Sequence, residues 1–336
     1  MPNKPRIGLL LGDPTGIGPE IVARLMADPS TADQAHIAII GDPRVWQAGR
    51  EIADNSSASA HLDSIPTIDV LPTHWLDQKT PVLLHALSSD ASDAPSGQVS
   101  AAAGRYALDS LRVALEFAQS GQLDAVCFAP LNKQAMHEAG SPFEDDLRYA
   151  MHVLEYDGNA GELNVLDNLW TARVTSHVPL RDVAALITVE RVCQAVELID
   201  SALQSAGKEK PHIAVAGLNP HAGEGGLFGS EEIEIIAPAV AKMQASGVQV
   251  SGPYPSDTVF LKARAGKFDA VVTMYHDQGQ VAMKLMGFEQ GVTVHGGLPI
   301  VVTTPAHGTA FDIAGQGKAN PAALQRAFAL ACEMTG

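Results

Sequence analysis

The feature that most constrains the fold is a repeated alternation of short apolar runs with amphipathic helical stretches along the chain. A brief apolar run bounded by turn residues is typical of a buried strand, whereas apolar residues spaced three or four apart are typical of a helix. Strands separated by helices predict an α/β fold with a mainly parallel sheet. The predicted strands are 6–12, 36–41, 125–129, 172–176, 213–217, 270–274 and 298–303, and the clearest helices are 21–26, 100–119 and 189–206.

Two stretches break this alternation. Residues 88–98 are rich in Ser, Asp, Gly and Pro and predict a loop, while 141–170 has weak periodicity and predicts an irregular insertion. With 336 residues, the chain is long enough for two domains of ordinary size.

Charge and cysteine content narrow the class of protein. A formal net charge of −16 argues against nucleic acid or an anionic membrane as partner, and a small anionic substrate needs a local basic pocket. Cys127, Cys193 and Cys332 are scattered, which favours core thiols in a reducing compartment. The sequence shows no leader-type apolar region and no bilayer-spanning segment, so we expect a cytoplasmic protein.

Three histidines stand in polar, Gly- or Pro-marked segments beside apolar runs. They are His177 in Thr-Ser-His-Val-Pro-Leu, His221 in Gly-Leu-Asn-Pro-His-Ala-Gly and His276 in Met-Tyr-His-Asp-Gln-Gly. Each histidine taken alone is more often a hydrogen-bonded structural residue. Together, imidazoles at strand ends predict a catalytic divalent metal with an open position for substrate.

Nearby charged residues are candidates for the same chemistry. Asp277 follows His276 directly, and Asp257 lies in Tyr-Pro-Ser-Asp-Thr; each can orient an imidazole, bind the metal or move a proton. The alternative for both is a turn or helix-capping aspartate. Lys133 follows a strand and Pro130, so it is either a cleft residue or a solvated loop lysine.

Two glycine-rich segments are candidates for ligand binding. Residues 12–20 lack the spacing of the usual phosphate loops, so a structural turn and a ligand-contacting loop are equally good interpretations. In 307–321, small residues allow close backbone approach, and Asp312 can accept both hydroxyls of an adenosine ribose. The alternative is a loop that caps the helix after Pro321. The segment resembles the adenine-binding loop of isocitrate and isopropylmalate dehydrogenases.

Seven motifs together carry a closer resemblance. In order they are Gly-Asp-Pro-Thr-Gly-Ile-Gly-Pro-Glu at 12–20, Ala-Pro-Leu-Asn-Lys at 129–133, His-Val-Pro-Leu-Arg-Asp at 177–182, Gly-Leu-Asn-Pro-His-Ala-Gly-Glu-Gly-Gly at 217–226, Gly-Pro-Tyr-Pro-Ser-Asp-Thr at 252–258, Tyr-His-Asp-Gln-Gly at 275–279 and His-Gly-Thr-Ala at 307–310. The chain thereby resembles the 4-hydroxythreonine-4-phosphate dehydrogenase family of vitamin B6 biosynthesis over nearly its whole length.

The resemblance implies an α/β fold of the isocitrate and isopropylmalate dehydrogenase type, with two α/β domains and a cleft between them. Residues 1–128 and 296–336 are expected to form the domain with the cofactor loop, and 129–295 the domain with the metal ligands and dimer interface. It further implies a homodimer with a shared active site, NAD or NADP as cofactor, and one divalent metal (Zn, Mg, Mn, Co or Fe). The residues it implies are His177, His221 and His276 for metal, Lys284 for substrate, and His307, Asp312 and Asn320 for cofactor.

The chain also departs from the family pattern. Ala-Gly-Ser-Pro-Phe at 139–143 leads into acidic residues 144–146 rather than a His-Thr pair, and the nearest histidine, His152, comes about six positions late. The family's substrate Asn and Arg are replaced by Thr293 and Val302, and an Asp is replaced by Ala306. Terephthalate cis-dihydrodiol dehydrogenase is similar in lacking that pair and that arginine.

These features predict a metal-dependent, NAD(P)-linked oxidation of a secondary alcohol in a carboxylated diol or hydroxy acid, with decarboxylation following where the substrate permits. Lys284, Asp257 and Asp277 are the expected catalytic residues, and Lys284, Lys133 and Thr293 the expected substrate contacts. One alternative is the family's own oxidation of 4-phosphohydroxy-L-threonine. An alternative of another class is a non-catalytic small-molecule sensor.

Overall fold

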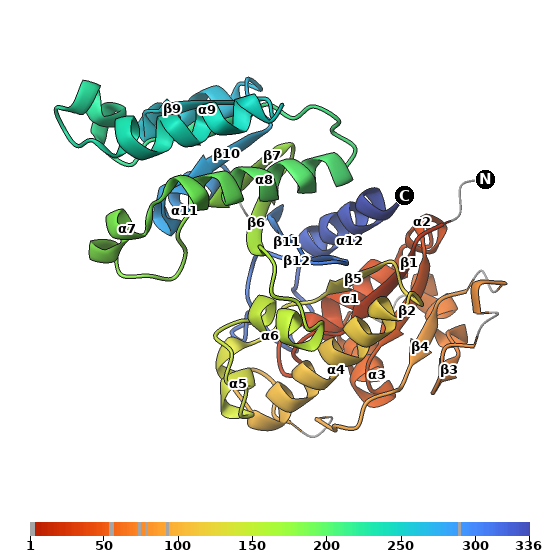
Figure 1. The fold of residues 1–336 in the computed structure, drawn as a ribbon. Helices are drawn as coiled ribbons and strands as arrows, with labels where there is room; N and C mark the ends of the chain where they lie inside the picture. The colour runs from red at the N-terminus through yellow and green to blue at the C-terminus, as the bar shows by residue number, and fades with distance from the viewer. Residues whose placement is uncertain (1–3, 54–56, 73–74, 78–79, 92–93, 288–289) are drawn as a thin grey trace. The chain divides into compact units, whose positions relative to one another are not determined.

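The computed structural model describes residues 4–53, 57–72, 75–77, 80–91, 94–287 and 290–336 (Figure 1). The chain divides into two compact units. The first comprises Met1–Asp157 and Leu298–Gly336, and the second comprises Gly158–Gly297. Residues 129–157, which we assigned to the second domain from the sequence, therefore cluster with the first unit.

The first unit is built on parallel strands. Its strand order is β3-β4-β2-β1-β5-β12, and every strand pair described in it is parallel. The strands are β1 (Arg6–Leu10), β2 (His36–Ile40), β3 (Thr67–Ile68), β4 (Val82–Leu84), β5 (Ala125–Phe128) and β12 (Val301–Pro305). Their residues are almost all buried, which is why these strands are continuous apolar runs rather than alternating ones.

Helices connect the strands of the first unit. They are α1 (Gly18–Ala27), α2 (Thr31–Gln34), α3 (Pro43–Ala53), η1 (Ser57–Ser64), η2 (Trp75–Asp77), α4 (Ala101–Gln119), α5 (Lys133–Glu138), α6 (Asp146–Val153) and α12 (Ala322–Thr335). The longest, α4, begins where the Ser100 hydroxyl accepts the backbone N–H of Ala102. Its buried face packs in one core with Leu10, Phe128 and Val302 from the sheet.

The second unit has a mixed sheet with the order β11-β6-β7-β10-β8-β9. The strands are β6 (Gly161–Leu166), β7 (Leu169–Arg173), β8 (Ile213–Ala216), β9 (Val250–Tyr254), β10 (Ala270–Thr273) and β11 (Val292–Gly296). Strands β7, β10, β8 and β9 are mutually parallel, whereas β6 is antiparallel to both β7 and β11. The four parallel strands therefore end at one edge of the sheet.

The helical segments of the second unit follow those strands. They are α7 (Leu180–Leu186), α8 (Val189–Ser205), η3 (Pro220–Gly226), η4 (Glu232–Ile236), α9 (Ala237–Ala245), α10 (Ser256–Arg264) and α11 (His276–Leu285). Segment η4 is a π-helical turn that leads directly into α9. No helix in the described parts of the chain is long and apolar enough to cross a membrane.

Most predicted strands are confirmed, with two corrections. The strand predicted at 172–176 runs from Leu169 to Arg173, because Leu169 and Trp170 pair with β6 in a hairpin. The irregular insertion predicted at 141–170 is wrong, since this stretch contains α6 and β6. Within β6, Glu162 and Asn164 alternate with Leu163 and Val165, and both polar side chains bond to Arg173.

Candidate active-site elements in the two units

Four predicted site residues follow the carboxyl ends of the parallel strands in the second unit. His177 follows β7, His276 follows β10, His221 follows β8 and Asp257 follows β9, and these strands are neighbours in the order β7-β10-β8-β9. Ligands of open α/β sheets bind at such carboxyl edges. The sequence prediction that the three histidines follow buried strands is confirmed.

Two of the three histidines lie side by side. The ring centroids of His177 and His276 are 5.7 Å apart, with 44° between the ring planes. The Nδ1 atom of His276 lies 2.7 Å from Oδ1 of Asp277, which orients the ring and leaves Nε2 for another partner. A carboxylate behind an imidazole is a common arrangement for metal-ligating histidines, so these residues fit a divalent ion.

The third histidine lies on a turn of its own. His221 is exposed, its ring centroid is 6.2 Å from that of Phe228, and its backbone is left-handed. Among the described residues, the three histidines do not form a group whose ligand atoms all lie within 4.8 Å of one another. The structure therefore brings His177 and His276 together, with His221 at the same sheet edge.

One face of α11 carries three polar side chains at four-residue intervals. His276, Gln280 and Lys284 share this face because residues four apart are neighbours on a helix. Lys284 is exposed and makes no ion pair within the part of the chain that the structure describes. A single unpaired cation on the face of His276 can attract an anionic group.

Arg173 is a site candidate that the sequence analysis missed. It ends β7, four residues before His177. Its side chain is 9% exposed and pairs with Glu162, while Nε donates to the Ser176 hydroxyl at 2.9 Å and Nη1 to Oδ1 of Asn164 at 3.1 Å. The sequence feature that could have identified it is an arginine at the end of an apolar run, four residues before the candidate metal ligand His177.

Asn164 links this arginine to Thr293. Its Nδ2 donates to the Thr293 hydroxyl at 3.2 Å, and Gln280 of α11 donates to its Oδ1. Thr293 is 9% exposed. The Thr293 hydroxyl therefore accepts a hydrogen bond from Asn164 on the neighbouring strand. To contact substrate as predicted, the same hydroxyl must bond to Asn164 and to substrate.

In the first unit, the predicted cofactor loop forms hydrogen bonds to segment 12–20 and packs against it. The Ile17 N–H donates to the Thr309 carbonyl at 3.0 Å, and the Ala319 N–H donates to Oε1 of Glu20 at 2.9 Å. Arg24 donates to the Gly317 carbonyl at 2.7 Å. A Cβ on Gly16 would lie 2.8 Å from that of Thr309, which explains why glycine stands at this contact.

The four remaining predicted residues all lie in this unit. Asp312 is exposed, and its carboxylate makes no hydrogen bond to other described residues, so it is available to ribose hydroxyls. Asn320 Oδ1 accepts the N–H of Ala322, the first residue of α12, at 3.0 Å, and Pro321 is the N-cap of that helix. His307 Nδ1 lies 3.0 Å from the Gly308 carbonyl, and Lys133 is the exposed first residue of α5.

The chain has a mixed α/β fold that a distant solved structure shares. A β-decarboxylating dehydrogenase from Thermococcus kodakarensis has the same fold, with a TM-score of 0.50 at 15% identity over 96% of this chain and 81% of that one. The predicted isocitrate-dehydrogenase-like fold class is confirmed. Within that class, the family described as pyridoxal phosphate biosynthetic protein PdxA matches residues 33–331, and the chain belongs to this family.

Individual relatives agree with the family. A Pseudomonas aeruginosa protein, provisionally named 4-hydroxythreonine-4-phosphate dehydrogenase 2, is 50% identical over 99% of this chain and 98% of its own. A Bradyrhizobium diazoefficiens protein, provisionally named D-threonate 4-phosphate dehydrogenase, is 40% identical over 96% and 94%. The chain is therefore a dehydrogenase that acts on a CH–OH group, as predicted.

Solved structures give the same result. The 4-hydroxythreonine-4-phosphate dehydrogenase of Klebsiella pneumoniae matches with a TM-score of 0.82 at 35% identity, covering 99% of this chain and 98% of that one. Terephthalate 1,2-cis-dihydrodiol dehydrogenase of Burkholderia xenovorans matches with a TM-score of 0.66 at 30% identity, covering 96% and 95%. The phosphate-substrate enzymes are thus the nearer of these relatives.

Proposed function

We propose that this chain oxidises the secondary alcohol of a small 4-phosphorylated hydroxy acid, such as 4-hydroxythreonine 4-phosphate or D-threonate 4-phosphate, with NAD or NADP. The observation that carries this proposal is the identity of 40–50% over nearly the whole chain to relatives named for those two substrates. The dihydrodiol enzyme stands at 30%. This reverses the preference for a non-phosphorylated diol that the departures from the family pattern suggested.

The structure also weakens the argument for that earlier preference. Val302 is fully buried in the core of the first unit, so the side chain at this position does not line an exposed pocket. Of the acidic residues after Phe143, Asp145 and Asp146 are buried, and Asp145 caps α6 by accepting the Arg148 N–H at 2.8 Å. Two of the three carboxylates therefore do not form an exposed anionic surface.

Each candidate site residue has a distinct role in the proposed reaction. His177, His221 and His276 would hold a divalent ion, which when bound lowers the pKa of a substrate hydroxyl; Zn, Mg, Mn, Co and Fe all suit this role. Asp277 bonds to the His276 ring. Asp257, which follows β9 at the same sheet edge, is our candidate to accept the proton. Lys284 binds the anionic group, with Lys133 and Thr293 as further contacts.

Exposed apolar side chains support a homodimer built through the second unit. Of nine large apolar residues exposed among the described ones, eight lie in this unit: Val178, Leu180, Leu227, Phe228, Ile233, Leu261, Val281 and Leu285. Several adjoin His177, His221 or α11. Exposed apolar side chains gathered in the unit that carries the candidate metal ligands favour a second copy that covers them. Buried free Cys127 and Cys193 are compatible with the cytoplasm, our proposed location.

Steady-state assays test the substrate. Cofactor reduction is followed at 340 nm with 4-phosphohydroxy-threonine, threonate 4-phosphate and a terephthalate-type dihydrodiol. We expect the highest kcat/KM with a phosphorylated substrate and no turnover in His276→Ala. A higher kcat/KM for the dihydrodiol would support the non-phosphorylated diol that the sequence analysis favoured. No turnover with any substrate would favour the non-catalytic small-molecule sensor.

Calorimetry tests the cofactor loop. Asp312→Ala should weaken NAD binding by roughly 1.5–3 kcal/mol, the scale of a lost hydrogen bond to a charged group. Asp312→Asn, which keeps the shape and one acceptor, should lose less. An unchanged dissociation constant in Asp312→Ala would remove Asp312 from the cofactor site.

A further inference from the structure

The segment that carries His221 has an unusual backbone. Within residues 219–226, here called the His221 turn, five consecutive residues from His221 to Gly225 have φ between +42° and +80°. Three of them, His221, Ala222 and Glu224, carry a Cβ. Left-handed conformations are visited by such residues singly and not in runs, so the surrounding structure must hold this turn in place.

The side chain that holds the turn is Glu232 of η4. Its Oε1 accepts the backbone N–H groups of Leu218 and Asn219, each at 2.7 Å, and its Oε2 accepts Nδ2 of Asn219 at 2.9 Å. Glu232 is only 3% exposed and has no ion pair with a lysine or arginine among the described residues. Three N–H donors therefore compensate the buried carboxylate, and all three belong to the entrance of the His221 turn.

Two glycines show how closely the turn surrounds this carboxylate. A Cβ on Gly223 would lie 2.7 Å from Oε2 of Glu232, and a Cβ on Gly217 would lie 3.0 Å from Oε1. Gly223 also has φ of +80°. The chain before and after His221 therefore packs directly against one side chain.

A second polar contact ties the same segment to α11. Gln278 lies two residues after His276; its Nε2 donates to the Gly217 carbonyl at 2.9 Å, and its Oε1 accepts the Met274 N–H at 2.7 Å. The segment entering the His221 turn is thus fixed on one side by Glu232 and on the other by the helix that carries His276. This connects two of the three candidate metal ligands through hydrogen bonds.

We propose that Glu232 is a positioning residue that holds the left-handed His221 turn and thereby sets the imidazole of His221 for metal binding. This inference rests on the proposed function in one respect, namely that His221 is a metal ligand. Without the Glu232 carboxylate, the N–H groups of Leu218 and Asn219 lose their acceptor, and the turn can relax toward right-handed backbone conformations that carry His221 away.

Glu232→Ala and Glu232→Gln test this role, with Glu234→Gln as the matched control. Glu234 is exposed on the same π-helical turn, so its variant removes the same charge without touching the carboxylate contacts. Metal-free protein is titrated with Co²⁺, and the dissociation constant and visible absorption spectrum are recorded. We expect roughly 10–100-fold weaker Co²⁺ binding in Glu232→Ala, the usual effect of losing a partner behind a metal ligand, and unchanged binding in the control.

Amide hydrogen exchange of the metal-free proteins supplies a second readout. Leu218 and Asn219 should exchange faster in both Glu232 variants than in Glu234→Gln. If Glu232→Ala does not fold, Glu232→Gln tests the proposal instead. This variant keeps the shape of the side chain and replaces one acceptor oxygen by an N–H donor. Native Co²⁺ affinity and unchanged exchange in the Glu232 variants would overturn the proposal. Failure of the unmodified protein to bind Co²⁺ would instead contradict the proposed metal site, and the exchange rates would still decide whether Glu232 holds the turn.

Discussion

The tripeptide Gly-Asp-Pro occurs twice in the first unit, at 12–14 and at 41–43, just beyond the ends of the adjacent parallel strands β1 and β2. Both aspartates are buried, Asp13 at 0% and Asp42 at 2% exposure. In both, Oδ1 accepts the backbone N–H two residues further on, from Thr15 at 2.9 Å and from Arg44 at 2.7 Å. The tripeptide and this hydrogen bond are therefore the same in both turns.

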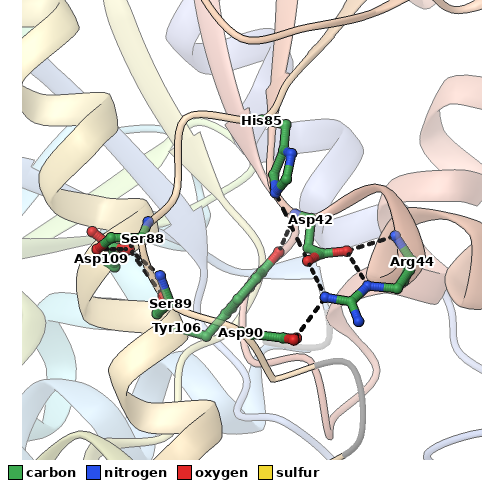
Figure 2. Close-up of polar contacts among 8 residues, drawn as sticks. All are labelled: Asp42, Arg44, His85, Ser88, Ser89, Asp90, Tyr106 and Asp109. Carbon is green, nitrogen blue, oxygen red and sulfur yellow. Dashed lines mark hydrogen bonds and ion pairs between the residues drawn. The ribbon is translucent and has the colours of Figure 1, made fainter.

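The surroundings of Asp42 suit a charged carboxylate. Figure 2 shows the Arg44 guanidinium against both carboxylate oxygens, with Nη2 2.9 Å from Oδ2, and also against Asp90 at 2.7 Å. The Asp42 N–H donates to the hydroxyl of buried Tyr106 at 3.0 Å. Burial raises the pKa of Asp42, but the hydrogen bonds and charge of Arg44 outweigh it, and the pKa lies below its ordinary value.

Among the described residues, no lysine or arginine forms an ion pair with Asp13. The Thr15 hydroxyl donates to Oδ1 at 2.7 Å, while Oδ2 has no hydrogen-bond partner among the described residues. Burial raises the pKa of Asp13, and the bonds from Thr15 offset this only in part. Thr15 also bonds to residues 97 and 98, beside the cofactor loop. The comparison teaches that the side chain two residues beyond the aspartate decides in which direction the pKa of the buried carboxyl moves.

The largest expected difference between the two turns lies in their glycines. Gly12 has φ of +77°, and a Cβ there would lie 2.6 Å from the Ala129 carbonyl oxygen; a Cβ on Gly41 would meet the Leu11 side chain at 2.5 Å and the Tyr106 hydroxyl at 2.7 Å. Gly12→Ala should lower the free energy of unfolding by about 2–5 kcal/mol, from backbone strain plus overpacking. Gly41→Ala should lower it by about 1–3 kcal/mol, because side-chain ends can move. Urea unfolding measures both, and equal losses would remove the distinction.

A smaller effect is expected at Asp42, and it depends on pH. Asp42→Asn should lower the free energy of unfolding by roughly 1–3 kcal/mol at neutral pH, because bonds to a charged acceptor are lost. Since the folded-state pKa is lowered, this stabilisation is present above the unfolded-state pKa of about 4 and disappears as the pH falls through the folded-state value. Chemical unfolding from pH 7 down to pH 3 follows the loss. A pH-independent difference between variant and parent would contradict the charged state of Asp42.

The smallest effect is expected at Asp13, with the opposite dependence on pH. A raised folded-state pKa means that the unmodified protein loses stability as the pH rises from about 4 through the folded-state value. Asp13→Asn has no such loss, so its stability relative to the parent should improve over that rise, whereas that of Asp42→Asn worsens. The same unfolding series measures both variants. Parallel slopes for the two would show that the turns do not differ in charge.

Much of the candidate site could be predicted from the sequence, because strand ends and motifs are local features. The runs before His177, His221 and His276 predicted strands, and the parallel order β7-β10-β8-β9 then brought their ends to one edge. The apolar runs also predicted an α/β fold, and the motif order indicated the family. The sequence analysis missed β6, and only the structure shows that its polar residues Glu162 and Asn164 bond to Arg173 of the neighbouring strand.

The tertiary structure decided properties that depend on partners distant in sequence. The sequence shows Gly-Asp-Pro twice, but only the structure shows one carboxylate bonded to the Arg44 guanidinium and the other to Thr15. It shows an arginine replaced by Val302, but only the strand position reveals that this side chain lies in a core. It shows His221 among glycines, while the left-handed turn depends on the buried Glu232 carboxylate eleven residues later. Local residue patterns determine elements and chemistry, whereas burial, protonation and backbone strain depend on which groups the fold places around each side chain.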